Sequence, residues 1–589
     1  MLNKMLLWCF SIFMASVSVA VPTLRLTVPE SSKISTPYAQ YRYGGVTESE
    51  NLVTFNGETI RVYPTGGFAG LVALSPGVNI WEFVATNKQY ESTTVVITIN
   101  RTISDELDLS TTLRILGSTV EPSQDLWLGA GEILNLSLRG SPSAQVKAFI
   151  GSDEVLLHQQ PSVPDAKVAR YNGLYQIPTV LKNQNLKVRY EMTLGDATVR
   201  EVSPGNVSYG SENYPTVAVI TESSANIYSS LGTARLGGAL LCMLPESTRL
   251  VLDGKIGNMY RIRLKKDFHA WTHESNLSVI PGAALPNATI GGATLESSTT
   301  GYDQIFIGTP ERLPYLVEAS GLDNKMKVHI FGAASNLTWI TNRTPLKVIR
   351  SIDWKQVADG HLVLDITLDR PPVWGYDATY PASSNGLRVI VKHPPVLSTH
   401  KKYPLQGLTI ALDAGHGGRS SGALGATRLL EKDCNLDIVL QLKSFLEHKG
   451  ANIVLTRGDD SDIDMNTRRQ IAIDSSANML VSIHNNSTGE ISDPLLWKGS
   501  LTLYRHDIDR PLSEAIQTRM SKIPNLYNGG LVSSFNFSLV KHTDMPEVLV
   551  ECAYMSNPED EMLLSIPSGR GEIAKAIADG IIDHVLKYR

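Results

Sequence analysis

The sequence has few cysteines, no large excess of charge of either sign and no long apolar run beyond its first twenty residues. Four cysteines in 589 residues exclude a disulfide-stabilised scaffold. Because 53 basic residues face 58 acidic ones, for a net charge of -5, no global positive field favours nucleic acid. A hydrophobic content of 42% with 19% charged residues is that of a globular chain, which excludes disorder, collagen and coiled coil. At roughly 150 residues per domain, the length predicts about four domains.

The first twenty residues have the pattern of a signal peptide. The stretch from Met5 to Met14 is almost entirely apolar, and Ser18-Val19-Ala20 offers small residues at a cleavage site. We therefore expect residues 1–20 to be removed and the mature chain to begin near Val21, in the periplasm, at the cell surface or outside the cell. An uncleaved anchor is the alternative. No later run approaches 18 apolar residues, so no membrane-spanning segment is expected after cleavage.

Residues 21–402 have the composition of β structure, with short alternating runs between turn-rich segments. Residues 21–102 resemble an Ig-like β domain with a hairpin turning at Asn56-Gly57, a dipeptide that favours the type I′ turn. Residues 103–212 are expected to form a second β domain. No internal repeat is visible in this region.

The next two segments are also predicted to be β domains. Residues 213–282 resemble a bacterial SH3-like domain, in which Trp271 is either a core residue or a ligand platform. Residues 283–402 are a further β domain, which serves either as a spacer or as a module that binds the cell wall.

From residue 403 to residue 589 strands and helices alternate. Near-continuous apolar strands are followed by helices with one apolar face, such as a final helix that places Ile573, Ile577, Ile581 and Val585 on one stripe. A helix beginning at Glu431 is expected to bury Ile438, Leu442, Phe445 and Leu446. This alternation predicts a three-layer α/β domain around a mainly parallel sheet.

Four ionisable residues are expected at one edge of that sheet. His416 follows the first strand, His484 follows the strand ending at Ile483, and Glu551 ends the strand that begins at Val548. Glu431, at the start of a helix, can reach the same edge. Two histidines and one carboxylate are a common catalytic zinc shell, and a second carboxylate beside the metal-bound water is the usual general base.

Each of these residues also has an ordinary interpretation when taken alone. A single histidine is more often a packed or surface residue than a ligand. Glu431 could complement the helix dipole, and Glu551 could form a strand-end ion pair. Their joint placement beside loops rich in glycine and asparagine favours the metal site.

Six motifs occur here in the order found in one family: Asp413–Gly418, Glu431–Leu436, Leu455–Arg457, Ser482–Asn486, Met545–Glu551 and Met555–Asp560. Residues 404–589 thereby resemble the zinc-dependent N-acetylmuramoyl-L-alanine amidases of bacterial cell walls. The resemblance implies that His416, Glu431 and His484 bind Zn²⁺, that Glu551 is catalytic and that Asn486 contacts substrate. It also implies that Arg468 is structural.

The resemblance further implies action on peptidoglycan, by cleavage of the amide between N-acetylmuramic acid and L-alanine. We expect the protein to be a monomer. Some relatives carry a regulatory helix between the second histidine and the final glutamate. Only 67 positions separate His484 from Glu551, so we expect a site that is open without an activator. Two alternatives stay open: a zinc peptidase acting within the stem peptide, and a wall-binding protein without activity.

Overall fold

The computed structural model describes residues 21–102, 112–161, 167–179, 184–209, 215–232, 239–534 and 536–589. The predicted signal peptide lies outside these ranges. Among the described residues, Cys242, Cys434 and Cys552 are free thiols. Within the same ranges, none of the helices combines the length and the apolar character that crossing a membrane requires.

Residues 25–101 form two sheets that enclose an aromatic core. The three-stranded sheet has the order β1-β3-β6, and the five-stranded sheet has the order β2-β8-β7-β4-β5. Phe68, Trp81 and Phe83 are buried between them. The hairpin predicted at Asn56-Gly57 joins β4 to β5, and both turn residues have positive φ. The strand bounds are β1 Arg25–Val28, β2 Lys33–Thr36, β3 Gln40–Val46, β4 Leu52–Phe55, β5 Glu58–Ile60, β6 Gly67–Ala73, β7 Gly77–Thr86 and β8 Ser92–Arg101.

The next two predicted β domains are joined by one short strand. Strand β9 pairs with β15 on one side and with β19 on the other, so a single network of hydrogen-bonded strands runs through both. The strands up to β15 enclose a core of their own. The bounds are η1 Gly117–Thr119, β9 Leu126–Leu128, β10 Ile133–Gly140, β11 Gln145–Ile150, β12 Asp153–Gln159, β13 Ala169–Gln176, β14 Gln184–Leu194, β15 Ala197–Tyr209, β16 Thr216–Ile220, β17 Ser224–Tyr228, β18 Leu240–Pro245, β19 Arg249–Ile256, β20 Met259–Lys265, β21 Phe268–His273, η2 Glu274–Asn276 and β22 Leu277–Ile280.

Residues 288–392 form a five-stranded and a four-stranded sheet, with the orders β27-β23-β24-β31-β30 and β25-β26-β29-β28. Their core is continuous with that of strands β16 to β21. The bounds are β23 Ala288–Ser297, β24 Tyr302–Ile307, β25 Tyr315–Ala319, β26 Lys325–Phe331, β27 Ala333–Asn342, β28 Ile349–Ala358, β29 His361–Leu368, β30 Tyr376–Thr379 and β31 Leu387–Lys392.

The C-terminal domain is built on a six-stranded sheet with the order β33-β32-β34-β37-β35-β36. Every neighbouring pair in this sheet is parallel except β35 with β37. The strand bounds are β32 Thr409–Ala414, β33 Asn452–Leu455, β34 Met479–Asn486, β35 Ser500–Leu503, β36 Asn528–Val532 and β37 Glu547–Tyr554. The helix bounds are α1 Glu431–Glu447, α2 Met465–Asp474, η3 Asp507–Asp509, α3 Arg510–Met520, α4 Pro558–Ser565 and α5 Pro567–Lys587.

The two faces of this sheet bury different helices. Ile410 and Leu412 of β32 belong to the core that holds α1, α3 and α5, whereas Ala411, between them, packs in a smaller core with Ala472 of α2. The predicted stripe on α5 is fully buried. One expectation is wrong: Phe445 of α1 is 36% exposed, because the buried face of α1 is formed by Cys434, Ile438, Val439, Leu442 and Leu446.

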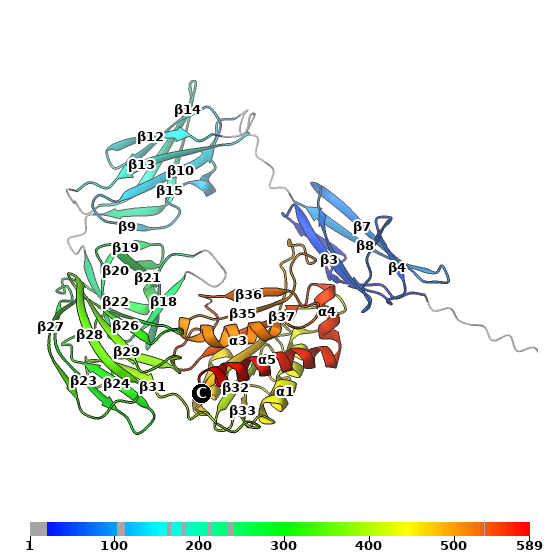
Figure 1. The fold of residues 1–589 in the computed structure, drawn as a ribbon. Coiled ribbons are helices and arrows are strands. Elements are labelled where there is room, and N and C mark those ends of the chain that lie inside the picture. Colours follow the sequence, from blue (N-terminus) through cyan, green and yellow to red (C-terminus); the bar gives the residue numbers. More distant parts are fainter. Residues whose placement is uncertain are drawn as a thin grey trace, which may run out of the picture.

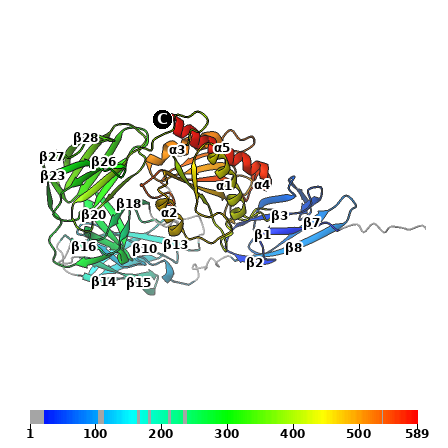
Figure 2. The same cartoon turned by 90° about the horizontal axis from the view of Figure 1, so that it is seen from below.

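Figures 1 and 2 show the C-terminal domain between the first β domain and the sheets of residues 288–392. Trp374 packs against His584 of α5 on one side. On the other side, strands β1 and β3 face the C-terminal domain.

Candidate active site

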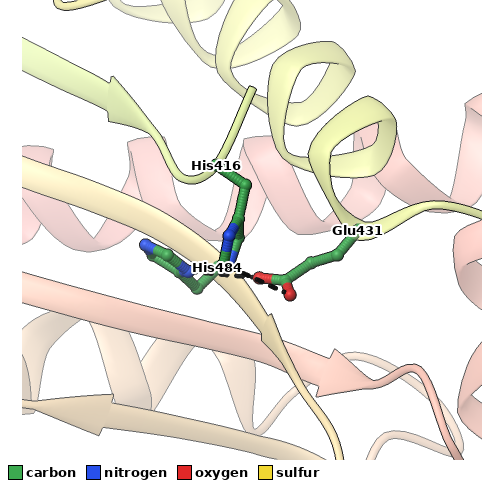
Figure 3. Close-up of side chains that lie close together, drawn as sticks. All are labelled: His416, Glu431 and His484. Carbon is green, nitrogen blue, oxygen red and sulfur yellow. Dashed lines mark hydrogen bonds and ion pairs between the residues drawn. The ribbon is translucent and has the colours of Figure 1, made fainter. Parts of the chain in front are cut away.

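Three ligand-type side chains from three separate elements converge at one edge of the C-terminal sheet (Figure 3). His416 lies in the loop after β32, Glu431 is the first residue of α1, and His484 lies in β34. His416 Nε2 is 3.2 Å from Glu431 Oε2, and His484 Nδ1 is 3.1 Å from Glu431 Oε1. The three donor atoms all lie within 4.8 Å of one another.

Two buried arginines hold the backbone of the loop that carries His416. Arg468 donates to the carbonyl oxygens of Ala414 and His416, at 2.7 and 2.6 Å, and to Asp413 Oδ1 at 2.8 Å. Arg457 donates to the carbonyl oxygens of Ala414 and Gly415, at 2.7 and 3.0 Å. His416 itself has φ of +62°, a conformation that a non-glycine residue keeps only where its surroundings fix it.

Both arginines act on the loop backbone, so they position His416. The structural role that the family resemblance implies for Arg468 stays a prediction, and its place beneath the loop fits that role. Arg457 was only a motif residue in the sequence. Its role could not be found there, because it depends on loop carbonyl groups that carry no sequence signal.

Two glycines leave the space that the side chains of the three donor residues need to come close to one another. A Cβ at Gly415 would overlap the imidazole of His484, and one at Gly422 would overlap the Glu431 carboxylate and the ring of His416. Gly422 also has φ of +69°, which favours glycine for a second reason. Any larger residue at either position would displace a donor.

Hydrogen bonds fix the orientation of the donors. Ser420 Oγ lies 2.9 Å from His416 Nδ1, which leaves Nε2 toward Glu431. The Glu431 carboxylate accepts from the backbone N–H groups of Ala423 and Asn485, at 2.8 and 3.1 Å. Although burial disfavours its charge, hydrogen bonds from both histidines hold the pKa of Glu431 well below its usual value.

Glu551 lies on β37, the strand next to β34 in the sheet, beside the three donor residues. Strands β34 and β37 are parallel neighbours, and their register puts His484 opposite Glu551. The Glu551 side chain is buried, and among the described residues its Oε2 has no hydrogen-bond partner. Burial raises the pKa of Glu551 to about 7, with the Glu431 charge acting in the same direction and His484 opposing them.

The predicted strand ends need correction. His484 lies within its strand and not after it, and Glu551 does not end its strand, because β34 continues to Asn486 and β37 to Tyr554. Past His484 and Glu551 the ladder between these two strands continues, with Asn486 opposite Tyr554. On its other side β37 pairs with β35 in antiparallel fashion, with Leu501 opposite Glu551. The two side chains are therefore neighbours across a ladder.

A pocket of about 780 Å³ contains all four residues. Asn486, predicted to contact substrate, also lines it, as do Met465, Phe537 and Leu539. These three apolar residues were not foreseen, because they come from a helix start and a loop without a motif. Within the described residues between His484 and Glu551, α3 is the α-helix present, and it packs in the core with α5.

The donor set fits a zinc ion. Two imidazoles and one carboxylate are zinc ligands at about 2.0–2.2 Å, so neighbouring donors around a tetrahedral ion lie about 3.3 Å apart. The two separations between a histidine and Glu431, 3.1 and 3.2 Å, are close to that value, and the two histidine donors lie within 4.8 Å of each other. Gly415 and Gly422 leave the space that the donor side chains occupy, which a Cβ at either position would fill.

Comparisons with known proteins find relatives of the C-terminal domain. Residues 410–583 match the family model described as N-acetylmuramoyl-L-alanine amidase. Over 186 residues the chain is 35% identical to the "Probable cell wall amidase LytH" of Staphylococcus aureus, which covers 31% of this chain and 60% of the relative. The chain thus spans three-fifths of the length of these curated relatives.

Two solved structures are also similar. The N-acetylmuramoyl-L-alanine amidase AmiC2 of Nostoc punctiforme shares 35% identity, with 31% of this chain and 96% of that one covered and a TM-score of 0.29. The catalytic domain of the amidase CwlV from Bacillus (Paenibacillus) polymyxa var. colistinus shares 32%, with 31% and 99% covered and a TM-score of 0.29. The C-terminal domain of this chain belongs to the N-acetylmuramoyl-L-alanine amidase family.

Proposed function

We propose that this protein hydrolyses the amide bond between N-acetylmuramic acid and L-alanine in peptidoglycan, in a zinc-dependent reaction that remodels the cell wall or separates daughter cells. One observation carries the proposal: the buried carboxylate of Glu551, whose Oε2 has no hydrogen-bond partner among the described residues, lies beside a cluster of two histidines and one glutamate in a single open pocket. That arrangement suits hydrolysis by an activated water molecule.

His416, Glu431 and His484 would hold the zinc ion. When bound, zinc polarises the substrate carbonyl and brings the pKa of its water to about 7. The arginines beneath the loop keep His416 in place, and Ala423 and Asn485 fix the Glu431 carboxylate through backbone N–H groups.

Glu551 is the general base in this proposal. Its carboxylate accepts a proton from the attacking water and then passes that proton to the leaving amine of L-alanine. A pKa of about 7 suits a group that must both take and release a proton near neutral pH. Asn486, on the pocket wall, would contact the substrate.

The remaining domains are assigned in the same proposal. Residues 403–589 form a three-layer α/β catalytic domain, which the helices on both faces of the sheet support. The two small sheets of residues 21–102 support an Ig-like domain, and residues 213–282 are SH3-like. Residues 103–212 are a second β domain, and residues 283–402 are a spacer or bind the wall. Cleavage of the signal peptide would place the protein in the periplasm or at the cell surface.

Digestion of purified sacculi, with and without a chelator, tests the proposal. We expect the zinc-loaded protein to release whole stem peptides and to leave intact glycan strands, and the chelator to stop the reaction. Mass spectrometry identifies the products. Fragments cut within the stem peptide would indicate the alternative zinc peptidase, and binding of sacculi without any release would indicate a wall-binding protein.

A further inference from the structure

The first β domain is docked at the rim of the metal pocket. The backbone N–H of Arg42 donates to the carbonyl of Glu490 at 2.8 Å, and Gln40 Nε2 donates to the carbonyl of Ile491 at 2.7 Å. Thr27 Oγ1 lies 3.4 Å from the carbonyl oxygen of Ala426. In both overall views β3 faces the C-terminal domain. The contacted segments follow His484 and precede Glu431, so the docked domain borders the site itself.

A cavity of about 470 Å³ lies between the two domains, and we call it the interdomain cavity. Val28, Tyr41 and Arg42 line it from the first domain, and Ala423 and Ser487 line it from the C-terminal domain. Ala423 and Ser487 also line the metal pocket. The backbone N–H of Ala423 is bonded to Glu431, so one residue of the interdomain cavity wall is in direct contact with a proposed zinc ligand.

The interdomain cavity carries charges of both signs. Arg42 is partly buried there, and among the described residues its Nε is buried without a hydrogen-bond partner. Glu30 and Glu490 are exposed at its edge. The hydroxyl of Tyr41 donates to the Glu490 carboxylate, which orients that group beside Arg42. A buried guanidinium donor without a partner is costly unless a ligand satisfies it.

The chemistry of the substrate indicates which part of it would bind in the interdomain cavity. On one side of the scissile amide lies the glycan, whose sugars are uncharged once the lactyl group is in amide linkage. On the other side lies the stem peptide, which carries free carboxylates and the ammonium group of a diamino acid. Charges of both signs in the interdomain cavity match the peptide and not the glycan.

We propose that the first β domain completes the substrate site, and that Arg42 binds a carboxylate of the stem peptide in the interdomain cavity. This inference rests on the proposed function and adds a specificity-determining residue from a domain outside the amidase family match. A guanidinium pairs with a carboxylate through parallel hydrogen bonds, which makes it selective for that group.

Two synthetic muramoyl peptides test the proposal. They are identical except that the peptide carboxylates are free in one and amidated in the other. We expect kcat/KM of the zinc-loaded full chain to be about tenfold higher for the free peptide, a factor that corresponds to 1.4 kcal/mol. In Arg42→Gln the ratio should fall close to one, and in Arg42→Lys it should recover in part.

Arg61→Gln is the matched control. Arg61 lies on the same domain and pairs with Glu559 at 3.2 Å, but it does not line the interdomain cavity, so its variant should keep the tenfold ratio. A wild-type chain without preference for the free peptide, or an Arg42→Gln chain that keeps the preference, would overturn the proposal.

Binding of the two released stem peptides to the wild-type chain, measured by calorimetry, needs no variant and no turnover. We expect the free peptide to bind about tenfold more tightly than the amidated one, and equal affinities would contradict the inference. If the free peptide is preferred but neither muramoyl substrate is cleaved, only the proposed function fails.

Discussion

Asp303 of β24 and Glu551 of β37 are both buried carboxylates within strands, one in the β region and one in the C-terminal domain. Asp303 Oδ2 accepts from the backbone N–H groups of residues 347, 348 and 349 at 2.7–3.0 Å, and Oδ1 lies 2.9 Å from His393 Nε2. Glu551 Oε2 has no such partner among the described residues.

The difference appears in the two pKa values. Burial alone would raise the pKa of Asp303, but the backbone donors and His393 lower it. Burial raises the pKa of Glu551 to about 7, and the charge of His484 offsets only part of that rise. A fully bonded buried carboxylate fixes a loop, whereas an unbonded one at neutral pH can exchange a proton, and only the second is suited to acid–base chemistry.

The same contrast extends to the two regions as a whole. Among the described residues, the region before residue 403 buries only Asp253, Asp303 and His361 of its aspartate, glutamate, histidine and arginine side chains. The C-terminal domain buries ten: Asp413, Glu431, Arg457, Arg468, Asp509, Glu547, Glu551, Asp560, Glu561 and His584. Burial of charge is therefore concentrated in the domain where it supports a site.

The largest effect is expected from Glu551→Gln. The amide keeps the size of the side chain but cannot accept the proton, so the rate of stem-peptide release should fall by about 10³-fold. Zinc content, measured by elemental analysis, should be unchanged, because Glu551 is not among the proposed ligands. Near-normal digestion of sacculi by this variant would contradict the role of Glu551.

Asp303→Asn is expected to affect stability and not activity, the reverse of Glu551→Gln. It removes the charge that three N–H groups share, which should lower the local stability of residues 288–392 by about 2–3 kcal/mol while leaving amidase activity unchanged. Hydrogen exchange measured by mass spectrometry reports this local opening. Asp353→Asn, at an exposed position of β28, is the control and should change little.

Arg468→Lys should weaken zinc binding about tenfold. A lysine cannot replace the fork that holds Asp413 and the carbonyl groups of Ala414 and His416, and residues that orient metal ligands typically contribute this much. Competition with a chromophoric chelator measures the affinity. Arg469→Lys is the matched control, because Arg469 lies on the same helix but pairs with Asp544 and Glu547. Equal losses in both variants would argue against a specific role.

The sequence predicted what depends on local pattern and could not predict what depends on distant partners. The apolar stripe of α5 follows from helical spacing. The helix that carries Arg468 begins at Met465, because Asp464 caps it by accepting from two backbone N–H groups. The register that puts His484 beside Glu551 depends on strand pairing. The contact between Arg42 and Glu490 joins two domains, and no periodicity in either segment reports it.

The smallest effect concerns pH and compares the two carboxylates directly in metal-free protein. The folded pKa of Glu551, about 7, lies above its unfolded value, so its contribution to stability is present at low pH and is lost as pH rises through 7. Between pH 6 and pH 8 the wild-type chain should therefore lose on the order of 1 kcal/mol relative to Glu551→Gln. The lowered pKa of Asp303 keeps that group ionised throughout, so the difference between wild type and Asp303→Asn should stay constant. Calorimetric unfolding with chelator present measures both stability differences. Parallel pH profiles for wild type and Glu551→Gln would contradict the distinction between the two carboxylates.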